Sequence, residues 1–118
     1  MKLRDVVAIL EGDCFCCEPH LLEAEVTRAR ASDLMSEILA ADALPDILLT
    51  GLCNTHVIRT ASVFGIKAVI IVRGKAPTKG MIDMANEEEI VLASTKEGLF
   101  TSCGKLYAAG IRGVKENI

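Results

Sequence analysis

The order of apolar and helical segments in the second half of the chain most constrains the fold. Each apolar run is short and is followed by a segment of helical character. The apolar runs cover 46–50, 68–72 and 90–93, and the helical segments cover 55–64, 78–86 and a last stretch up to about Ala109. Strands buried on both faces are apolar throughout, as in the run 68–72. Alternating strands and helices predict a parallel sheet joined by right-handed crossovers.

The first half of the chain predicts a mixture of short elements. Apolar residues at helical spacing indicate a helix from Leu3 to Leu10 that stops before Gly12. The segments 14–17 and 25–31 have strand character, and Pro19 lies in a turn at 18–20 between them. A further helix is expected over 34–41. Ser32 or Asp33 can cap it.

Taken together, these elements predict one α/β domain over residues 1–118, with a three-layer arrangement around a largely parallel sheet. A chain of 118 residues is long enough for one core and too short for several domains. The polar segment 112–118 is expected to be a loose tail. Because 51% of the residues are hydrophobic, the domain is expected to cover leftover apolar surface by forming a homodimer.

Composition excludes several partners and compartments. The net charge of −3 argues against binding to a phosphate backbone, and three Phe, one Tyr and no Trp argue against stacking on nucleic-acid bases. The apolar run 68–72 is far shorter than the roughly 20 residues that a membrane-spanning helix needs. The N-terminus lacks a secretory leader pattern, and five cysteines, three of them crowded together, suit a reducing compartment. A cytoplasmic location is therefore expected.

Polar residues follow each predicted parallel strand, where ligands usually bind in α/β sheets. The loops 50–54, 73–77 and 94–96 combine hydroxyls, cations and glycines, which suit a small anion such as a nucleotide or a phosphorylated metabolite. The candidate ligand-binding residues are Thr50, Gly51, Asn54, Arg59, Arg73, Gly74, Ser94 and Thr95, with Lys75 and Lys96 as further cations. The alternative is structural: Asn54 and Thr95 cap helices, the glycines turn the chain and the lysines are solvated. No known phosphate-binding loop motif is present.

The cysteines offer a weaker candidate site. Cys14, Cys16, Cys17 and His20 form the candidate metal set. Alternation along a strand would turn Cys17 away from the other two thiols, and no second cysteine pair follows, so buried structural cysteines are the favoured interpretation. Cys53 and His56 are close enough in sequence to form a nucleophilic pair, but no paired carboxylates indicate general acid and base chemistry.

Several short blocks of the sequence resemble one family, and they cover 31–36, 48–54, 58–61, 72–77 and 92–95. The chain is similar to the stand-alone DRTGG-domain proteins, whose domain also occurs beside CBS domains and inside some phosphotransacetylases. The family's fold is similar to the N-terminal domain of HPr kinase/phosphorylase. The Asp-Arg pair and the complete Thr-Gly-Gly of the family are missing here, although Gly51 and Gly74 are kept.

The resemblance implies a small regulatory or sensory domain. The kinase activity of HPr kinase belongs to another domain with a phosphate-binding loop, which this chain lacks, so an enzymatic role is not expected. The leading hypothesis is a non-catalytic regulatory domain, without a cofactor, that binds a small anionic ligand at the loops after the parallel strands. The alternatives are a protein-interaction or scaffolding subunit and a cysteine-rich metal or thiol protein.

Overall fold

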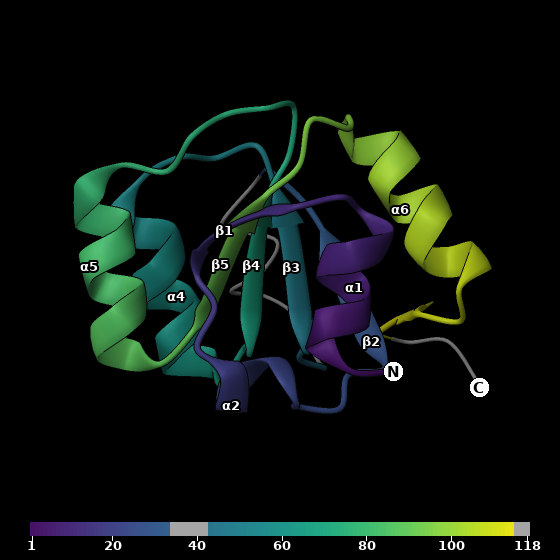
Figure 1. Cartoon of the computed structure of the whole chain (residues 1–118), viewed down its shortest axis with the longest axis horizontal. Helices are drawn as coiled ribbons and strands as arrows, with labels where there is room; N and C mark the ends of the chain where they lie inside the picture. The colour runs from purple at the N-terminus through teal and green to yellow at the C-terminus, as the bar shows by residue number, and fades with distance from the viewer. Residues whose placement is uncertain (34–42, 115–118) are drawn as a thin grey trace.

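A computed structural model describes residues 1–33 and 43–114. The described elements form three layers, with one six-stranded sheet between two layers of helices (Figure 1). The strands are β1 (Asp13–Cys16), β2 (Arg28–Ala31), β3 (Ile47–Thr50), β4 (Ala68–Ile71), β5 (Val91–Ser94) and β6 (Arg112–Gly113). The helices are α1 (Leu3–Ile9), α2 (Pro19–Leu22), α4 (Thr55–Phe64), α5 (Lys79–Glu88) and α6 (Leu99–Ala108). The prediction of an α/β fold with a largely parallel sheet is confirmed.

The sheet has the strand order β1-β5-β4-β3-β2-β6. From β5 to β6 every neighbouring pair is parallel, and β1 alone is antiparallel, against β5. Successive strands β2, β3, β4 and β5 therefore lie side by side in chain order. Their carboxyl ends, and the loops that follow them, meet at one edge of the sheet, which is the upper edge in Figure 1.

Alternate residues of the central strands face two separate hydrophobic cores. Leu48, Val69 and Leu92 pack under α4 and α5, with Val57 and Met81 from those helices. Their strand neighbours Leu49, Ile70 and Ala93 face the other side, where α1 and α6 supply Val6 and Leu106. All twelve residues of β3, β4 and β5 are buried, since each strand is covered on both faces. Burial on both faces therefore explains the unbroken apolar runs of the sequence.

Local signals set the ends of the helices on the α4 and α5 face. The Asn54 side chain accepts a hydrogen bond from the backbone N–H of Val57, which caps the start of α4. Gly65 ends that helix in the left-handed conformation, with φ of +71°. Thr78 caps α5 in the same way through the N–H of Met81. The helix α4 has the predicted limits, and α5 begins one residue later than predicted.

The structure differs from the predictions in three of the described segments. The expected turn at 18–20 is the start of the short helix α2, because Pro19 at its first position has a backbone angle already suited to a helix. The expected loose tail is wrong for Arg112 and Gly113, which form β6 against Arg28 and Ala29. The predicted helix at 34–41 lies outside the described residues. The strand predicted at 25–31 is shorter, since β2 begins at Arg28.

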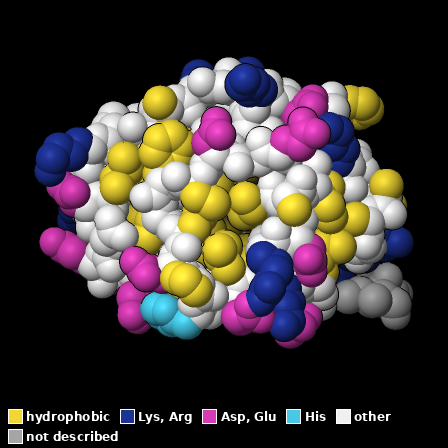
Figure 2. Space-filling model, in the orientation of Figure 1, with side chains coloured by type: hydrophobic (Ala, Val, Ile, Leu, Met, Phe, Trp, Pro, Cys, Tyr) yellow, Lys and Arg dark blue, Asp and Glu magenta, His cyan; other side chains and the backbone are white. Residues whose placement is uncertain are grey.

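The outer surface combines apolar and charged side chains. Figure 2 shows hydrophobic side chains gathered near the centre of the face that carries α1, with acidic and basic side chains around them. Within the described residues, no helix has the length and apolar character needed to cross a membrane.

Candidate ligand-binding site

Side chains from three neighbouring strand ends converge on the carboxylate of Asp33. This residue follows β2, and its Oδ1 accepts a hydrogen bond of 2.6 Å from the backbone N–H of Gly51, just after β3. The same oxygen accepts a hydrogen bond of 3.2 Å from the hydroxyl of Thr50. After β4, a guanidinium nitrogen of Arg73 lies 3.5 Å from Asp33 Oδ2. With Lys75, these residues are named the loop cluster.

An unusual backbone conformation positions Arg73. Its φ is +65°, and that of Gly74 is +69°. The N–H of Arg73 donates to the carbonyl of Glu97 and the N–H of Gly74 to that of Thr95, each at 2.8 Å, so the loop after β5 holds the turn in place. A left-handed conformation is strained for arginine, and such strain is concentrated at functional sites. The turn directs the guanidinium of Arg73 back toward β3.

Gly51 has to be a glycine for Arg73 to reach this position. A Cβ atom at Gly51 would overlap the guanidinium of Arg73. The ammonium of Lys75 donates a hydrogen bond of 2.9 Å to the Gly51 carbonyl, so both cations approach Gly51. The buried hydroxyl of Thr50 also accepts a hydrogen bond of 3.1 Å from the N–H of Leu52. The loop after β3 is thus held by side chains on both sides.

The electrostatics of the loop cluster favour a negatively charged oxygen. The hydrogen bond from the Gly51 N–H is the main reason that the pKa of Asp33 is lowered from its usual value. Partial burial opposes this effect, and Thr50 and Arg73 add to it. Asp33 is therefore ionised at neutral pH. A backbone N–H, a hydroxyl and a guanidinium that converge on one oxyanion form the donor set that phosphates and carboxylates prefer.

The structure brings together four of the predicted ligand-binding residues: Thr50, Gly51 and Arg73 in the loop cluster, and Gly74 in the turn that positions it. Asn54 is the exposed cap of α4, which is the structural role left open above. Arg59 is exposed on α4, without a hydrogen bond or ion pair to any residue in the described ranges. Asp33, the centre of the cluster, was considered only as a helix cap in the sequence.

Ser94 and Thr95 lie at the end of β5, and both are buried. The hydroxyl of Thr95 donates to the carbonyl of Leu10 at 2.7 Å and accepts from the N–H of Glu97 at 3.2 Å. Thr95 thereby ties the loop after β5 to the end of α1. Lys96 and Thr95 also line a small polar hollow of about 140 Å³, which they share with Leu10, Glu11, Asp13 and Glu97.

The four metal candidates do not converge on one point, although Cys17 lies within hydrogen-bonding reach of Cys14, against the expectation that it turns away from the other thiols. Cys14 is exposed, Cys16 is buried, and the register of β1 against β5 shifts between them. Burial, with a contribution from Cys14, raises the pKa of Cys17 to about 12, which keeps this thiol neutral. The imidazole of His20 lies 3.8 Å from the carboxylate of Glu89. Among the residues with described positions, no three His, Cys, Asp or Glu side chains are arranged to hold a metal ion.

The proposed pair of Cys53 and His56 is not formed. The Cys53 thiol donates a hydrogen bond of 3.1 Å to the carbonyl of Ala76, and His56 is exposed on α4. This contact joins the loop after β3 to the loop after β4. Cys53 therefore makes a structural contact, in place of the nucleophilic role that the sequence analysis left open.

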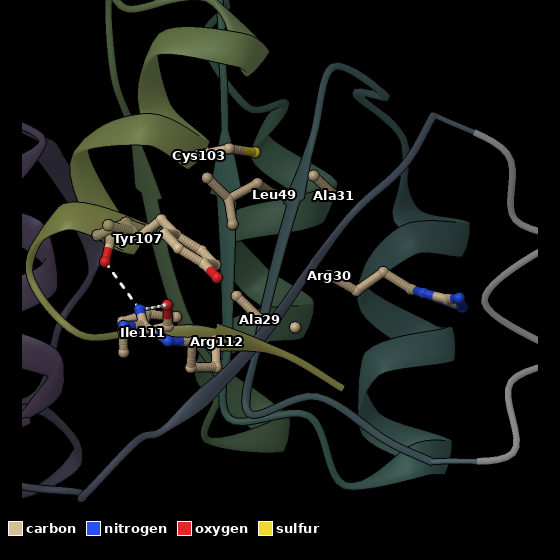
Figure 3. Close-up of a pocket in the computed structure, with 10 residues that line it drawn as sticks. Ala29, Arg30, Ala31, Leu49, Cys103, Tyr107, Ile111 and Arg112 are labelled. Carbon is tan, nitrogen blue, oxygen red and sulfur yellow. Dashed lines mark hydrogen bonds between the residues drawn. The ribbon is translucent and has the colours of Figure 1, made fainter. Parts of the chain in front are cut away.

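A second hollow lies away from the loop cluster, between α6 and the edge of the sheet (Figure 3). Its volume is about 270 Å³. Mostly apolar side chains line it, and it is named the apolar pocket. Its lining residues are Ala29, Arg30, Ala31, Leu49, Cys103, Leu106, Tyr107, Ile111, Arg112 and Gly113. Sequence reasoning missed this pocket, because its walls come from elements far apart in the chain.

Comparison with known proteins places the fold. No family model and no curated protein sequence matches the chain. Among solved structures, it is similar to the crystal structure of the CBS and DRTGG domains from the regulatory region of a Clostridium perfringens pyrophosphatase, in complex with the activator diadenosine tetraphosphate. The TM-score is 0.70 at 15% sequence identity, over 89% of this chain and 45% of that chain.

The similarity shows that the chain has the fold of part of that CBS and DRTGG region. It spans less than half of the neighbour's length. The resemblance to the DRTGG domain is thus supported at the level of the fold. The further likeness to HPr kinase stays a prediction.

Proposed function

We propose that this chain is a regulatory domain that binds a small anionic ligand, such as a nucleotide or a phosphorylated metabolite, at the loop cluster. The observation that carries the proposal is the convergence of the Gly51 N–H, the Thr50 hydroxyl and the Arg73 guanidinium on one oxyanion, the carboxylate of Asp33. The structural neighbour, a regulatory region in complex with a nucleotide activator, supports this role.

Binding then proceeds by exchange of one oxyanion for another. A phosphate oxygen of the ligand takes the place of the Asp33 carboxylate and accepts hydrogen bonds from Gly51 and Arg73. Lys75, which is already bonded to the carbonyl of Gly51, adds a second positive charge next to the same residue. The start of α4, three residues further along, favours negative charge in the same region.

The same geometry favours binding over catalysis. A carboxylate with a lowered pKa is a weak base, so Asp33 is poorly suited to accept a proton from a substrate at neutral pH. The other members of the loop cluster are a hydroxyl, a backbone amide and two cations, which stabilise negative charge. We therefore assign the cluster to recognition of an anion.

A thermal-shift titration with ATP, ADP, AMP, diadenosine tetraphosphate and inorganic phosphate tests the proposal. At least one of these should raise the melting temperature, and Arg73→Ala should remove the rise. Arg4→Ala, on α1, is the control, because it removes one positive charge away from the cluster. The proposal is wrong if no anion stabilises the protein, or if the shift is the same in Arg73→Ala and the wild type.

The other predicted residues define the extent of the site. If the ligand reaches beyond the loop cluster, Arg59→Ala on α4 should weaken binding less than Arg73→Ala, since Arg59 is exposed. Ser94 and Thr95 are buried, so substitutions there should act on stability more than on affinity.

A role in protein interaction, including the predicted homodimer, is the second candidate function. Phe100 and Tyr107 lie seven residues apart on α6, and therefore on one side of the helix. They are 91% and 51% exposed. Exposed aromatic side chains on one helix face are typical of a surface that a partner covers. Light scattering of the wild type and of Phe100→Ser tests this candidate: a dimer that becomes a monomer in the variant supports it.

A further inference from the structure

The apolar pocket is separate from the loop cluster and needs its own explanation. None of the residues of the loop cluster lines it. Its volume of about 270 Å³ is close to the lower end of the range for small-molecule sites, about 300–1,000 Å³. Such sites are mostly apolar, with a few polar groups that orient the ligand. The lining of this pocket has that composition.

The pocket exists because the edge of the sheet is only partly covered. Ala29 and Ala31 of β2 present methyl groups to the α6 side, while the side chain of Arg30 points to the other side of the sheet (Figure 3). The strand β6 pairs with Arg28 and Ala29 only. The space beside Ala31 is therefore filled neither by a large side chain nor by a neighbouring strand in the described part of the chain.

The inner walls of the pocket are rigid and uncharged. Leu49, Leu106 and Ile111 are almost fully buried in the core beneath it. Burial raises the pKa of Cys103, so that its thiol is neutral and acts as an apolar surface. The side chain of Tyr107 extends from α6 toward β2 across the pocket (Figure 3). An apolar group of matching size would bury these surfaces without a polar penalty.

One cation is fixed at the border of the pocket. The guanidinium of Arg112 lies 4.2 Å from the centre of the Tyr107 ring. One of its nitrogens donates hydrogen bonds to the carbonyls of Tyr107, at 2.9 Å, and Ile111, at 3.0 Å. A guanidinium has five N–H donors in a planar arrangement. No carboxylate among the described residues pairs with Arg112.

We propose that the apolar pocket binds a small carboxylic acid with a compact aliphatic or aromatic body. The body lies between Ala29, Leu49 and the ring of Tyr107. The carboxylate pairs with the guanidinium of Arg112, which supplies a charge-assisted hydrogen bond. The volume of about 270 Å³ suits a body smaller than a whole nucleotide. This ligand therefore differs in class from that of the loop cluster, and the proposal does not depend on the function proposed above.

The intrinsic fluorescence of the protein reports directly on this pocket. Tyr107 is the only tyrosine, and the chain has no tryptophan. The wild type is titrated with isovalerate and cyclohexanecarboxylate, which do not absorb at tyrosine wavelengths, and with the corresponding uncharged amides. The acids should change the emission in a saturable way and slow the alkylation of Cys103, measured by mass spectrometry. The amides should bind about tenfold more weakly, because they lack the charge that pairs with Arg112.

Three variants separate the contributions of shape and charge. Ala31→Leu should block the pocket and abolish the fluorescence change, and Arg112→Gln should weaken the acids to the level of the amides. Ala108→Leu is the matched control, because Ala108 is exposed on α6, next in sequence to Tyr107, but does not line the pocket. This variant should bind as the wild type does.

Three results would overturn the proposal. The first is the absence of any change with either acid, and the second is equal binding of acids and amides. The third is a dimer, detected by sedimentation, that both Ala31→Leu and Phe100→Ala disrupt. That result would assign the pocket to a side chain from a second copy of the chain.

Discussion

The loop cluster and the apolar pocket use consecutive residues of β3, yet the two sites are opposite in character. Thr50 belongs to the cluster, and Leu49 forms a wall of the pocket. In the cluster, polar groups from three loops satisfy one another around Asp33. In the pocket, apolar walls surround a space that the described side chains leave open. A site formed by polar groups can be occupied by the protein's own residues, whereas an apolar hollow at a sheet edge needs a ligand or a partner to fill it.

The largest expected effect on the free energy of unfolding comes from a substitution on the pocket side of β3. Leu49→Ala should lower the free energy of unfolding by about 2–5 kcal/mol, since it removes a buried side chain and leaves a cavity. Leu49 is only 1% exposed, and its removal would join the new cavity to the pocket. Urea denaturation measures this loss. A loss below about 1 kcal/mol would mean that the wall relaxes into the space, against the expectation for a rigid core.

The next effect concerns the adjacent residue on the cluster side. Thr50→Val keeps the shape of the side chain but removes the hydroxyl that accepts from Leu52 and donates to Asp33. We expect a loss of about 1–3 kcal/mol, because Leu52 keeps an N–H without its acceptor. Thr101→Val, at an exposed position on α6, is the matched control and should be near neutral. Equal stability of the two variants would show that the cluster contributes little to folding.

A smaller effect separates the backbone of Arg73 from its side chain. Both Arg73→Ala and Arg73→Gly remove the ion pair with Asp33, but only glycine adopts a φ of +65° without strain. The glycine variant should therefore be more stable than the alanine variant by about 1 kcal/mol. Thermal unfolding of the two proteins gives the difference. If alanine is tolerated equally, the turn is not held in the left-handed conformation in solution.

The smallest effect is a dependence on pH. The pKa of Asp33 is lower in the folded protein than in the unfolded chain, so the carboxylate contributes stability above the unfolded value of about 3.9. This contribution is lost as the pH falls through the lowered folded value. Wild type should exceed Asp33→Asn in stability at neutral pH by no more than about 1 kcal/mol, because the side chain is 40% exposed. The difference should disappear in acid. A difference that grows in acid would mean that folding raises the pKa of Asp33.

Much of the fold could be predicted from the sequence, because local signals are strong in the second half of the chain. The limits of α4 follow from an asparagine cap and a terminal glycine, and the buried strands follow from their unbroken apolar runs. Since parallel strands place their following loops at one edge, the sequence also predicted that Thr50, Gly51 and Arg73 would be neighbours. Their use in ligand binding stays a prediction.

The remaining features depend on contacts between distant residues. Asp33 is 18 residues from its partner Gly51, and its sequence context suggested a helix cap. The left-handed turn at Arg73 is held by carbonyls of the loop after β5, which no local pattern indicates. The strand β6 has two residues, too few for an alternating pattern, and the apolar pocket arises only when α6 returns the chain to this edge.

The burial of β4 also affects what happens when the protein unfolds. Residues 68–72 form a short segment of high β-propensity without proline or charge, which is the composition of segments that stack into amyloid-like aggregates. In the folded chain β4 is paired on both edges, with β3 and β5. Lys67 and Arg73 flank the run with positive charges, as residues that oppose self-association do. Arg73 is thus also placed to oppose self-association of the unfolded chain, and we expect its replacement by an uncharged residue to lower the yield of refolding.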